Sequence, residues 1–440
     1  IHIMELSSTN RQILRIAIPS IISNITVPLL GLIDVTIVGH LGSAAYIGAI
    51  AVGGMLFSMI YWIFGFLRMG TGGLTAQAYG AKNQPEMARI LMRSVIISLL
   101  LAAALIILQY PIRMAAFTVI DASAEVQRLA TQYFHICIWG APATLALYSF
   151  NGWFIGMQNS RYPMYIAITQ NIVNIAASLL FVLGLHMKVD GVALGTLIAQ
   201  YSGFVMAVLL WLSHYSPLRI HMKRNGLFDA EAMRRFFTVN RDIFLRTICL
   251  VAVTTFFTST GAAYGDVVLA VNTLLMQLFT LFSYIMDGFA YAGEALTGKC
   301  IGERNHTHLR STVLLLFKWG IGLSAAFTLL YGIGGQGFLS LLTDDSTVIS
   351  ASSEYFYWVL AIPIAGFSAF LLDGICIGAT ATRIMLKAMI VASVSFFLVY
   401  FGTRSMLYNH ALWMGFIVYL SLRGIMQAYW LRRLRIFERS

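Results

Sequence analysis

The sequence repeats a pattern of glycine, polar and basic residues after a fixed offset of 222 residues. The matched positions are Leu74-Thr75 with Leu296-Thr297, Gly80 with Gly302, Asn83 with Asn305, Gly152 with Gly374, Gly156 with Gly378 and Arg161 with Arg383. Because the offset is close to half of the 440 residues, it indicates two similar halves and not a solenoid of short units.

The amino-acid composition indicates what surrounds these two halves. Hydrophobic residues make up 59% of the chain and charged residues 11%, against roughly 45–50% and about 25% in soluble domains. Apolar segments recur along the whole length, each near the roughly 20 residues that a helix needs to span a bilayer. The twelve segments are 14–38, 45–68, 88–110, 126–150, 162–184, 190–215, 242–263, 267–292, 310–333, 351–376, 384–403 and 407–431. We therefore predict an all-α integral membrane protein with twelve transmembrane helices in two pseudo-symmetric six-helix bundles.

The same segments predict the domain organisation. An N-terminal lobe covers residues 1–215, a cytoplasmic linker 216–241 and a C-terminal lobe 242–440. Since each half holds an even number of spans, the halves are related by an axis along the membrane normal and both termini are expected in the cytoplasm. Basic and aromatic residues alternate in the linker, which fits either an amphipathic helix on the inner leaflet or a solvated loop. Two homologous halves in so apolar a chain are typical of a transporter.

The net charge of +11 is distributed in a way that indicates topology. With the N-terminus inside, 23 of the 29 Lys and Arg residues fall in or beside cytoplasmic segments and four near outer ones. The cytoplasmic group includes Arg93, Arg246 and Arg423, whereas Arg68 and Lys318 fall within or at the ends of spans. This bias is the positive-inside pattern. We therefore expect the lipid bilayer, and not a nucleic acid, to be the partner of this charge.

Patterns for catalysis or metal binding are incomplete in the sequence. The four cysteines show no CxxC spacing, so we expect no disulfide. The segment 293–300 resembles a phosphate-binding loop, but it ends in Cys300 where a hydroxyl is needed and follows no strand. His306 and His308 form a single pair in a loop. We predict no catalytic residue, no metal site and no cofactor.

Asp34 is the acidic residue that stands out within the first apolar segment. An ionisable group at mid-bilayer costs at least about 2.5–3.5 kcal/mol, so a carboxyl group there points to function. Pro28 and Gly31 precede Asp34 and predict a hinge, because proline removes a helix hydrogen bond and glycine weakens the next turn. We expect Asp34 to gain and lose a proton as the helix bends. The alternative is a permanently protonated Asp34 that hydrogen-bonds a neighbouring helix.

Two later segments carry polar residues that would surround Asp34 if the first, fifth and sixth spans converge. Asn171, Asn174 and Ser178 are spaced for one face of the fifth span, and Thr196 and Gln200 lie in the sixth. We predict that these five residues form a polar network in the N-terminal lobe. Helix–helix hydrogen bonding is the other common use of such residues in membrane bundles.

The C-terminal lobe has three candidate acids of its own. Asp287 and Glu294 are seven residues apart, on one helical face, and Asp373 lies in the tenth span. Carboxyl groups that line one cavity would suit a cationic substrate or a second proton. Satisfied polar contacts within the bundle are the alternative for Asp287, and ion pairing near the inner end of the span is the alternative for Glu294.

Several motifs together resemble one transporter family. The segment from Asp34 to Gly42 and the segment from Leu372 to Arg383 resemble the span 1–2 and span 10 motifs of MATE (multidrug and toxic compound extrusion) transporters. The segments from Ser23 to Asp34 and from Tyr284 to Tyr291 are most similar to the DinF branch. The resemblance covers essentially the whole chain. It implies two six-helix lobes around a central cleft, and antiport of drugs or toxic organic compounds against protons or sodium.

The resemblance also implies roles for individual residues. Asp34 would be the coupling carboxylate, with Asn174 and Thr196 in its network, and Asp373 would be the matching acid of the C-terminal lobe.

The sequence departs from the family at two places. Ser178 stands where many members carry an acid, and the seventh span has no acid beyond Asp242 at its start. Both departures favour protons over sodium as the coupling ion.

Together these features predict a multidrug efflux antiporter that works by alternating access. We expect it to export organic, often cationic and aromatic, compounds in exchange for protons, as a monomer in the bacterial inner membrane. One alternative is a sodium-coupled drug antiporter. Another is a flippase for lipid-linked saccharides, which needs a cluster of cationic side chains for which Arg68 and Lys318 are the only candidates. An intramembrane enzyme would need a paired acid motif, or a nucleophile with its base.

Overall fold

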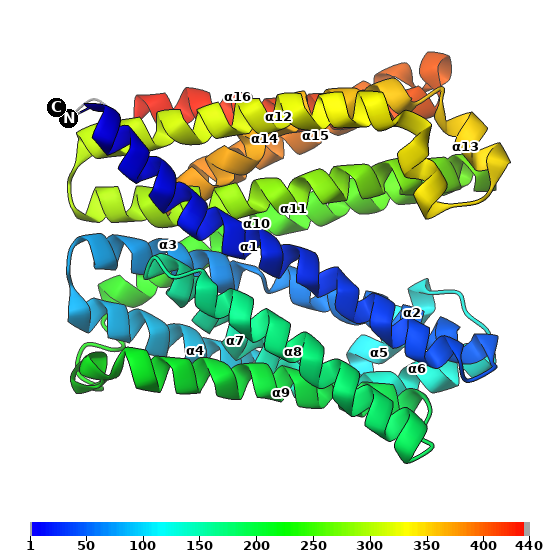
Figure 1. Cartoon of the computed structure of the whole chain (residues 1–440), viewed down its shortest axis with the longest axis horizontal. Coiled ribbons are helices and arrows are strands. Elements are labelled where there is room, and N and C mark those ends of the chain that lie inside the picture. The colour runs from blue at the N-terminus through cyan, green and yellow to red at the C-terminus, as the bar shows by residue number, and fades with distance from the viewer. Residues whose placement is uncertain (1, 435–440) are drawn as a thin grey trace. The chain divides into compact units, whose positions relative to one another are not determined.

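The computed structural model describes residues 2–434, and within that range every regular element is a helix (Figure 1). The first half holds α1 (His2–Gly39), α2 (Ala44–Ile63), α3 (Phe66–Gly80), α4 (Gln84–Ile107), α5 (Gln109–Val119), α6 (Ala124–Cys137), η1 (Ile138–Gly140), α7 (Ala141–Gly156), α8 (Arg161–Leu179), η2 (Leu180–Gly184), α9 (Val189–His214) and η3 (Ser216–His221). The second half holds α10 (Ala230–Ala263), α11 (Asp266–Gly302), α12 (His306–Leu342), α13 (Ser346–Ser352), α14 (Phe356–Gly378), α15 (Thr382–Leu407) and α16 (Asn409–Arg433). The predicted all-α class is confirmed. The expected cytoplasmic C-terminus lies outside the described residues.

Eleven helical segments within residues 2–434 are long and apolar enough to cross a membrane. The twelfth predicted span, 126–150, corresponds to α6, η1 and α7, which together run from Ala124 to Gly156. Each of these pieces is too short to qualify alone, because η1 interrupts the α-helix beside Gly140 and Pro142 lies in the first turn of α7. The twelve spans of the prediction are therefore all matched by helical segments.

The chain divides into two compact units. Unit 1 comprises the residues up to Ile18 and those from Phe237 onward, and unit 2 comprises Pro19–Phe236. The predicted domain limits lie at 215/216 and 241/242, whereas the two units of the structure divide inside α1 and inside α10. The start of α1 belongs to unit 1 because its apolar side chains are buried there, and Trp319 Nε1 on α12 donates a hydrogen bond of 3.0 Å to Asn10 Oδ1.

The repeated glycines lie where two helices of one unit cross in direct backbone contact. A Cβ atom added to Gly152 on α7 would lie 2.1 Å from the backbone oxygen of Arg68 on α3, and one added to Gly374 on α14 would lie 2.1 Å from that of Ala290 on α11. Arg68 and Ala290 are themselves 222 residues apart. Since no side chain fits between such backbones, only glycine permits these crossings. The sequence repeat is therefore a repeated helix crossing.

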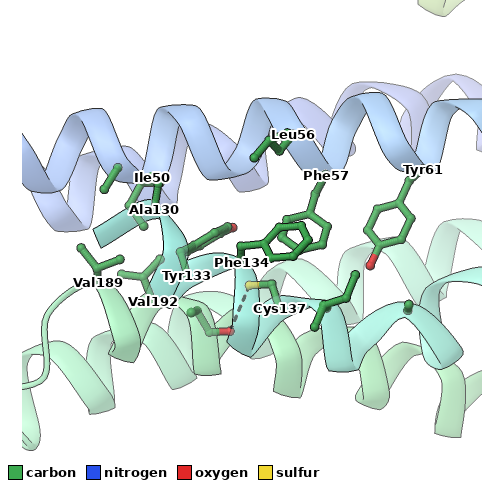
Figure 2. Packing of buried hydrophobic residues seen from close by; sticks show 14 of the residues in the cluster. Ile50, Leu56, Phe57, Tyr61, Ala130, Tyr133, Phe134, Cys137, Val189 and Val192 are labelled. Carbon is green, nitrogen blue, oxygen red and sulfur yellow. Dashed lines mark hydrogen bonds between the residues drawn. The ribbon is translucent and has the colours of Figure 1, made fainter. Parts of the chain in front are cut away.

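Unit 2 has an aromatic core between α2 and α6. Figure 2 shows Phe57 of α2 facing Tyr133 and Phe134 of α6, and the ring centroids of Phe57 and Phe134 are 5.3 Å apart. The Sγ atom of Cys137 lies 3.7 Å from the backbone oxygen of Ala193 on α9. This packing holds α6 against both α2 and α9.

A buried arginine attaches the segment between η3 and α10 to unit 2. Arg93 on α4 donates hydrogen bonds to the backbone oxygens of Leu227 (2.6 Å) and Gly226 (3.1 Å), and pairs with Glu86 at 2.8 Å. Gly226 has a φ of +76°, which glycine adopts without strain. The guanidinium group thus fixes the backbone of a segment that contains few other polar anchors.

Substitution of Arg93 should release this segment. Arg93→Ala removes three charge-assisted hydrogen bonds and leaves the carbonyl group of the buried residue Leu227 without its donor, a loss of roughly 3 kcal/mol. We expect faster trypsin cleavage after Lys223 and Arg224 in the purified protein, measured by the appearance of two half-length fragments. Arg161→Ala, at an exposed position, is the control. Equal cleavage of both variants would show that Arg93 does not anchor the segment.

Candidate functional site

Asp34 lies inside unit 2 with only 4% of its surface exposed. Thr196 Oγ1 on α9 donates a hydrogen bond of 3.3 Å to Asp34 Oδ2, and Asn174 Nδ2 on α8 donates one of 3.2 Å to Thr196 Oγ1. Helices α8 and α9 lie side by side (Figure 1) and present these two residues toward α1. The first, fifth and sixth predicted spans therefore do converge on the carboxyl group.

Three oxygen atoms in this region have no hydrogen-bond donor. Asp34 Oδ1, Asn174 Oδ1 and Ser178 Oγ are buried, and no donor among residues 2–434 reaches them. A buried acceptor without a donor costs about 1–3 kcal/mol, and more when it is charged. A proton on Asp34 would remove the charge and give the carboxyl group a donor of its own. The arrangement is therefore suited to binding and releasing one small cation, in the simplest case a proton.

Asp373 in unit 1 has different surroundings. It accepts hydrogen bonds on Oδ2 from Nη2 of Arg246 on α10 and from Nη2 of Arg423 on α16, the latter at 2.7 Å, and on Oδ1 from Gln427 at 2.6 Å. Both arginines are buried, with exposed fractions of 7% and 2%. Asp373 is thus neutralised inside its own lobe, whereas Asp34 has only neutral partners.

The other two acids of the C-terminal lobe lie apart from this cluster or at its edge. Glu294 is fully buried, and its backbone oxygen is where α14 crosses α11 at Gly378. Asp287, seven residues before Glu294 in α11, is half-buried and interacts electrostatically with Arg423. Asp287 and Asp373 thus both interact with Arg423, and a shared carboxylate cavity for the three acids stays a prediction.

The two halves of the chain each match the same protein family. The profile of the MatE family matches residues 19–180 and 243–401, one segment in each half of the chain. The chain belongs to the MatE family. Over 439 residues it is 37% identical to DNA damage-inducible protein F of Escherichia coli, which covers 98% of this chain and 94% of that protein. It is 26% identical to multidrug and toxin extrusion protein 1 of Homo sapiens over 356 residues, which covers 78% of this chain and 60% of the human protein.

Solved structures show the same fold for this MatE protein. The crystal structure of the Vibrio cholerae MATE transporter VcmN in its bent form superposes with a TM-score of 0.86 at 15% identity, covering 99% of both chains. A crystal structure of MATE in the bent conformation gives a TM-score of 0.83 at 21% identity, covering 97% of this chain and 95% of the other. At these identities the likeness shows the fold alone.

The remaining residues of the predicted polar network are placed differently in the MatE chain. Asn171 donates its amide to the backbone oxygen of Ala167 in its own helix, at 2.9 Å. Ser178 packs against Gly195, where an added Cβ would lie 2.2 Å from its hydroxyl, and Gln200 packs in the same way against Gly140 at 1.7 Å. The structure thus brings Asn174 and Thr196 to Asp34, and it uses Ser178 and Gln200 in close helix packing.

Sequence reasoning missed two residues of this site. Tyr133 on α6 is buried near the Asp34 carboxyl group and Thr196 and interacts electrostatically with that carboxyl group, as does Cys137 one turn later. The only sequence signal for Tyr133 is Gly53 on α2, since a Cβ there would lie 2.3 Å from the ring. That pairing joins two helices and cannot be read from either segment alone.

The predicted hinge residues lie within one helix. α1 runs from His2 to Gly39 through both Pro19 and Pro28. Hydroxyl groups return hydrogen bonds to the backbone near the prolines, from Ser23 to Pro19 O at 3.1 Å and from Thr26 to Ile22 O. A Cβ at Gly31 would meet nothing within 4 Å, so no close contact requires glycine there. The hinge role of Pro28 and Gly31 stays a prediction.

Three basic residues that the charge count assigned to cytoplasmic segments have structural roles inside the units. Arg93, Arg246 and Arg423 were grouped with cytoplasmic segments, but all three are buried and hydrogen-bonded inside their units. Their long helices carry them into the protein, where each neutralises or anchors a polar group. Arg68 and Lys318 are therefore not the only candidates for a cationic cluster in this MatE chain, and that argument against a flippase was wrong.

Proposed function

We propose that this MatE protein is a multidrug efflux antiporter that exports organic compounds in exchange for protons. Membership of the family and the printed names of its relatives, among them a multidrug and toxin extrusion protein of Homo sapiens, support export of toxic organic compounds. The observation that carries proton coupling is Asp34, a buried carboxyl group with one oxygen that lacks a donor. We further propose a multi-pass monomer in a bacterial inner membrane, in line with the Escherichia coli relative.

The proposed cycle uses the chemistry of Asp34 directly. A proton that arrives from outside neutralises the carboxylate and gives it a donor, which changes its preferred partners among Asn174 and Thr196. Because Asp34 lies on α1, this exchange alters the contacts that hold α1 against α8 and α9. The rearrangement changes the shape of the substrate site and releases the substrate to the outside. Loss of the proton to the cytoplasm restores the hydrogen bond from Thr196.

Sodium coupling is the second candidate, and it rests on the same three oxygen atoms. Asp34 Oδ1, Asn174 Oδ1 and Ser178 Oγ are all acceptors of the type that a hard cation prefers. A sodium ion needs several oxygen ligands at once, whereas a proton needs only one. Asp34 supplies the only carboxylate among these three acceptors, so we place the proton first.

Transport into proteoliposomes under separately imposed gradients tests the coupling ion. We expect purified protein to drive accumulation of ethidium when a proton gradient is imposed, and to do nothing when a sodium gradient of equal size replaces it. Uptake driven by sodium alone would overturn proton coupling, and no uptake under either gradient would overturn the antiporter proposal. Ethidium serves as a probe because it is a fluorescent aromatic drug.

Removal of the Thr196 hydroxyl group should weaken coupling without changing the shape of the site. Thr196→Val is nearly isosteric and leaves the Asp34 carboxylate without its donor on Oδ2. A lost hydrogen bond to a charged group of about 1.4 kcal/mol or more corresponds to an efflux rate about tenfold lower. Thr196→Ser keeps the hydroxyl group and should transport nearly as well as the wild type. Equal rates for the two variants would show that this hydrogen bond does not serve coupling.

Two other functions remain as alternatives of different kinds. A lipid-linked saccharide flippase gains some support from the buried arginines Arg246 and Arg423. An intramembrane enzyme has less support, since the human relative is named for the extrusion of drugs and toxins. Hydrolysis of a membrane substrate by the purified protein would revive the enzyme proposal.

A further inference from the structure

The guanidinium groups of Arg246 and Arg423 converge on a single carboxylate oxygen. Both donate from Nη2 to Asp373 Oδ2. Two positive charges held at one oxygen atom repel each other, and in a buried environment that repulsion is screened much less than in water. One carboxylate therefore does not fully balance this pair.

The same arginines have donors that nothing accepts. The Nε atoms of Arg246 and Arg423 are buried, and no acceptor among residues 2–434 reaches either of them. Buried donors on charged groups are costly when unsatisfied, and native proteins rarely leave them so. Two such donors on two converging cations indicate that an acceptor of negative charge, in addition to Asp373 and Asp287, belongs here at some stage.

The cluster is buried and flanked by aromatic rings, with small exposed fractions on two of its side chains. The side chains of Asp373 and Arg246 keep 10% and 8% of their surface exposed. The Arg423 guanidinium lies 5.4 Å from the ring centroid of Tyr419 and 5.9 Å from that of Phe370. Asp287 adds a carboxylate that interacts with Arg423 from α11. These carboxylates would disfavour an anion unless it displaces Asp373 from the arginines.

We propose that the Arg246–Arg423 pair is a binding site for the oxyanion of an aromatic organic acid, with Asp373 as the internal carboxylate that occupies the site when it is empty. The carboxylate of the ligand replaces Asp373 on the guanidinium groups, and its ring packs on Phe370 and Tyr419. Guanidinium groups suit this role because their fork geometry matches an oxyanion. This inference rests on the proposed export of organic compounds and assigns anions to the C-terminal lobe, in place of the cations expected from its acids.

Equilibrium binding of fluorescein, an aromatic carboxylate, to the full-length protein in phosphatidylcholine nanodiscs tests the proposal. Fluorescence anisotropy gives the dissociation constant at fixed pH and salt. Asp373→Asn removes the internal competitor and should bind fluorescein at least about tenfold more tightly than the wild type. Arg423→Gln and Arg246→Gln should bind at least about tenfold more weakly. If Asp373→Asn does not tighten binding, the cluster is an ion pair that only supports the fold.

A double variant and a control keep this test decisive. Arg423→Gln leaves Asp373 with one arginine and can lower stability, so Arg423→Gln/Asp373→Asn, which leaves the net charge of the cluster unchanged, is measured with it and should also bind weakly. Arg404→Gln removes an exposed arginine that lies 5.2 Å from the Phe401 ring centroid in the same unit, and it should change nothing. A loss of binding with Arg404→Gln equal to that with Arg423→Gln would overturn the assignment.

Two further measurements are needed. One distinguishes a lipid headgroup from a soluble organic acid as the anion, and the other distinguishes the anion-site proposal from the Asp34 coupling proposal. If the gain with Asp373→Asn disappears in nanodiscs that contain phosphatidylglycerol, a lipid headgroup is the occupant and the soluble acid is excluded. A gain that persists supports the soluble acid. Asp34→Asn should bind fluorescein like the wild type while it loses proton-driven transport. Normal transport by Asp34→Asn would overturn the coupling proposal and leave the anion site standing.

Discussion

Asp34→Asn is expected to abolish proton-driven efflux while the protein remains folded. The amide has the size of the carboxyl group and can still accept a hydrogen bond from Thr196, so the packing around α1 is preserved. It cannot bind and release a proton, and the cycle then lacks its driving step. We expect ethidium transport into proteoliposomes to fall to the level of protein-free vesicles under a full proton gradient.

The matched control for this result is a carboxyl group that lies in solvent. Asp121, in the loop after α5, is exposed, and Asp121→Asn should transport like the wild type. Substrate binding separates coupling from assembly, because Asp34→Asn should still bind ethidium at equilibrium. Proton-driven transport by Asp34→Asn at more than about a tenth of the wild-type rate would rule out Asp34 as the essential coupling group, since a tenfold loss reflects only about 1.4 kcal/mol.

Gly374→Ala is expected to prevent stable folding of the C-terminal lobe. The new methyl group would lie 2.1 Å from the backbone oxygen of Ala290, and a backbone atom cannot move aside as a flexible side chain can. Separating α14 from α11 disturbs the packing along both helices, with a cost of about 3 kcal/mol or more. We expect a lower yield of monodisperse protein in detergent and a lower apparent Tm.

Another glycine of α14 provides the control. A Cβ atom at Gly366 would have Leu420 Cδ1, 3.5 Å away, as its nearest neighbour, which is ordinary van der Waals contact. Gly366→Ala should therefore keep the Tm of the wild type. Gly152→Ala, the equivalent of Gly374→Ala in the N-terminal lobe, should lose stability as well. A stable Gly374→Ala protein would mean that α11 and α14 do not cross as closely as described.

The sequence was sufficient to predict the helical segments and the two-fold repeat, because both arise from local requirements. A lipid-exposed span must be helical and apolar for about 20 residues, so each segment can be recognised alone. The break between α6 and α7 was missed, and both helices were predicted as the single span 126–150. A glycine and a proline in an apolar stretch are compatible with a kinked helix as well as with an interrupted one.

The candidate site was only partly predictable, since its residues come from several helices. Polar spacing on the fifth span identified Asn174, but it did not show that Asn171 bonds to its own helix. The partners of Asp373 were missed because Arg246 and Arg423 lie near span ends, where basic residues are also placed by topology alone. Only the packing of α10, α14 and α16 shows that these arginines pair with Asp373 and do not simply mark a cytoplasmic span end.

The paired glycine crossings have a consequence for how each lobe can move. Where α3 meets α7, and where α11 meets α14, the contact is between a glycine and a backbone oxygen, so no rotamer change can relax it. These helix pairs must therefore travel as fixed frames during a transport cycle. In unit 2 any displacement within the lobe has to come from helices outside that frame, and these include α1, α8 and α9, which meet at Asp34. The duplicated glycines thus define a rigid helix pair in each half, and in unit 2 Asp34 and its hydrogen-bond partners lie on helices outside that pair.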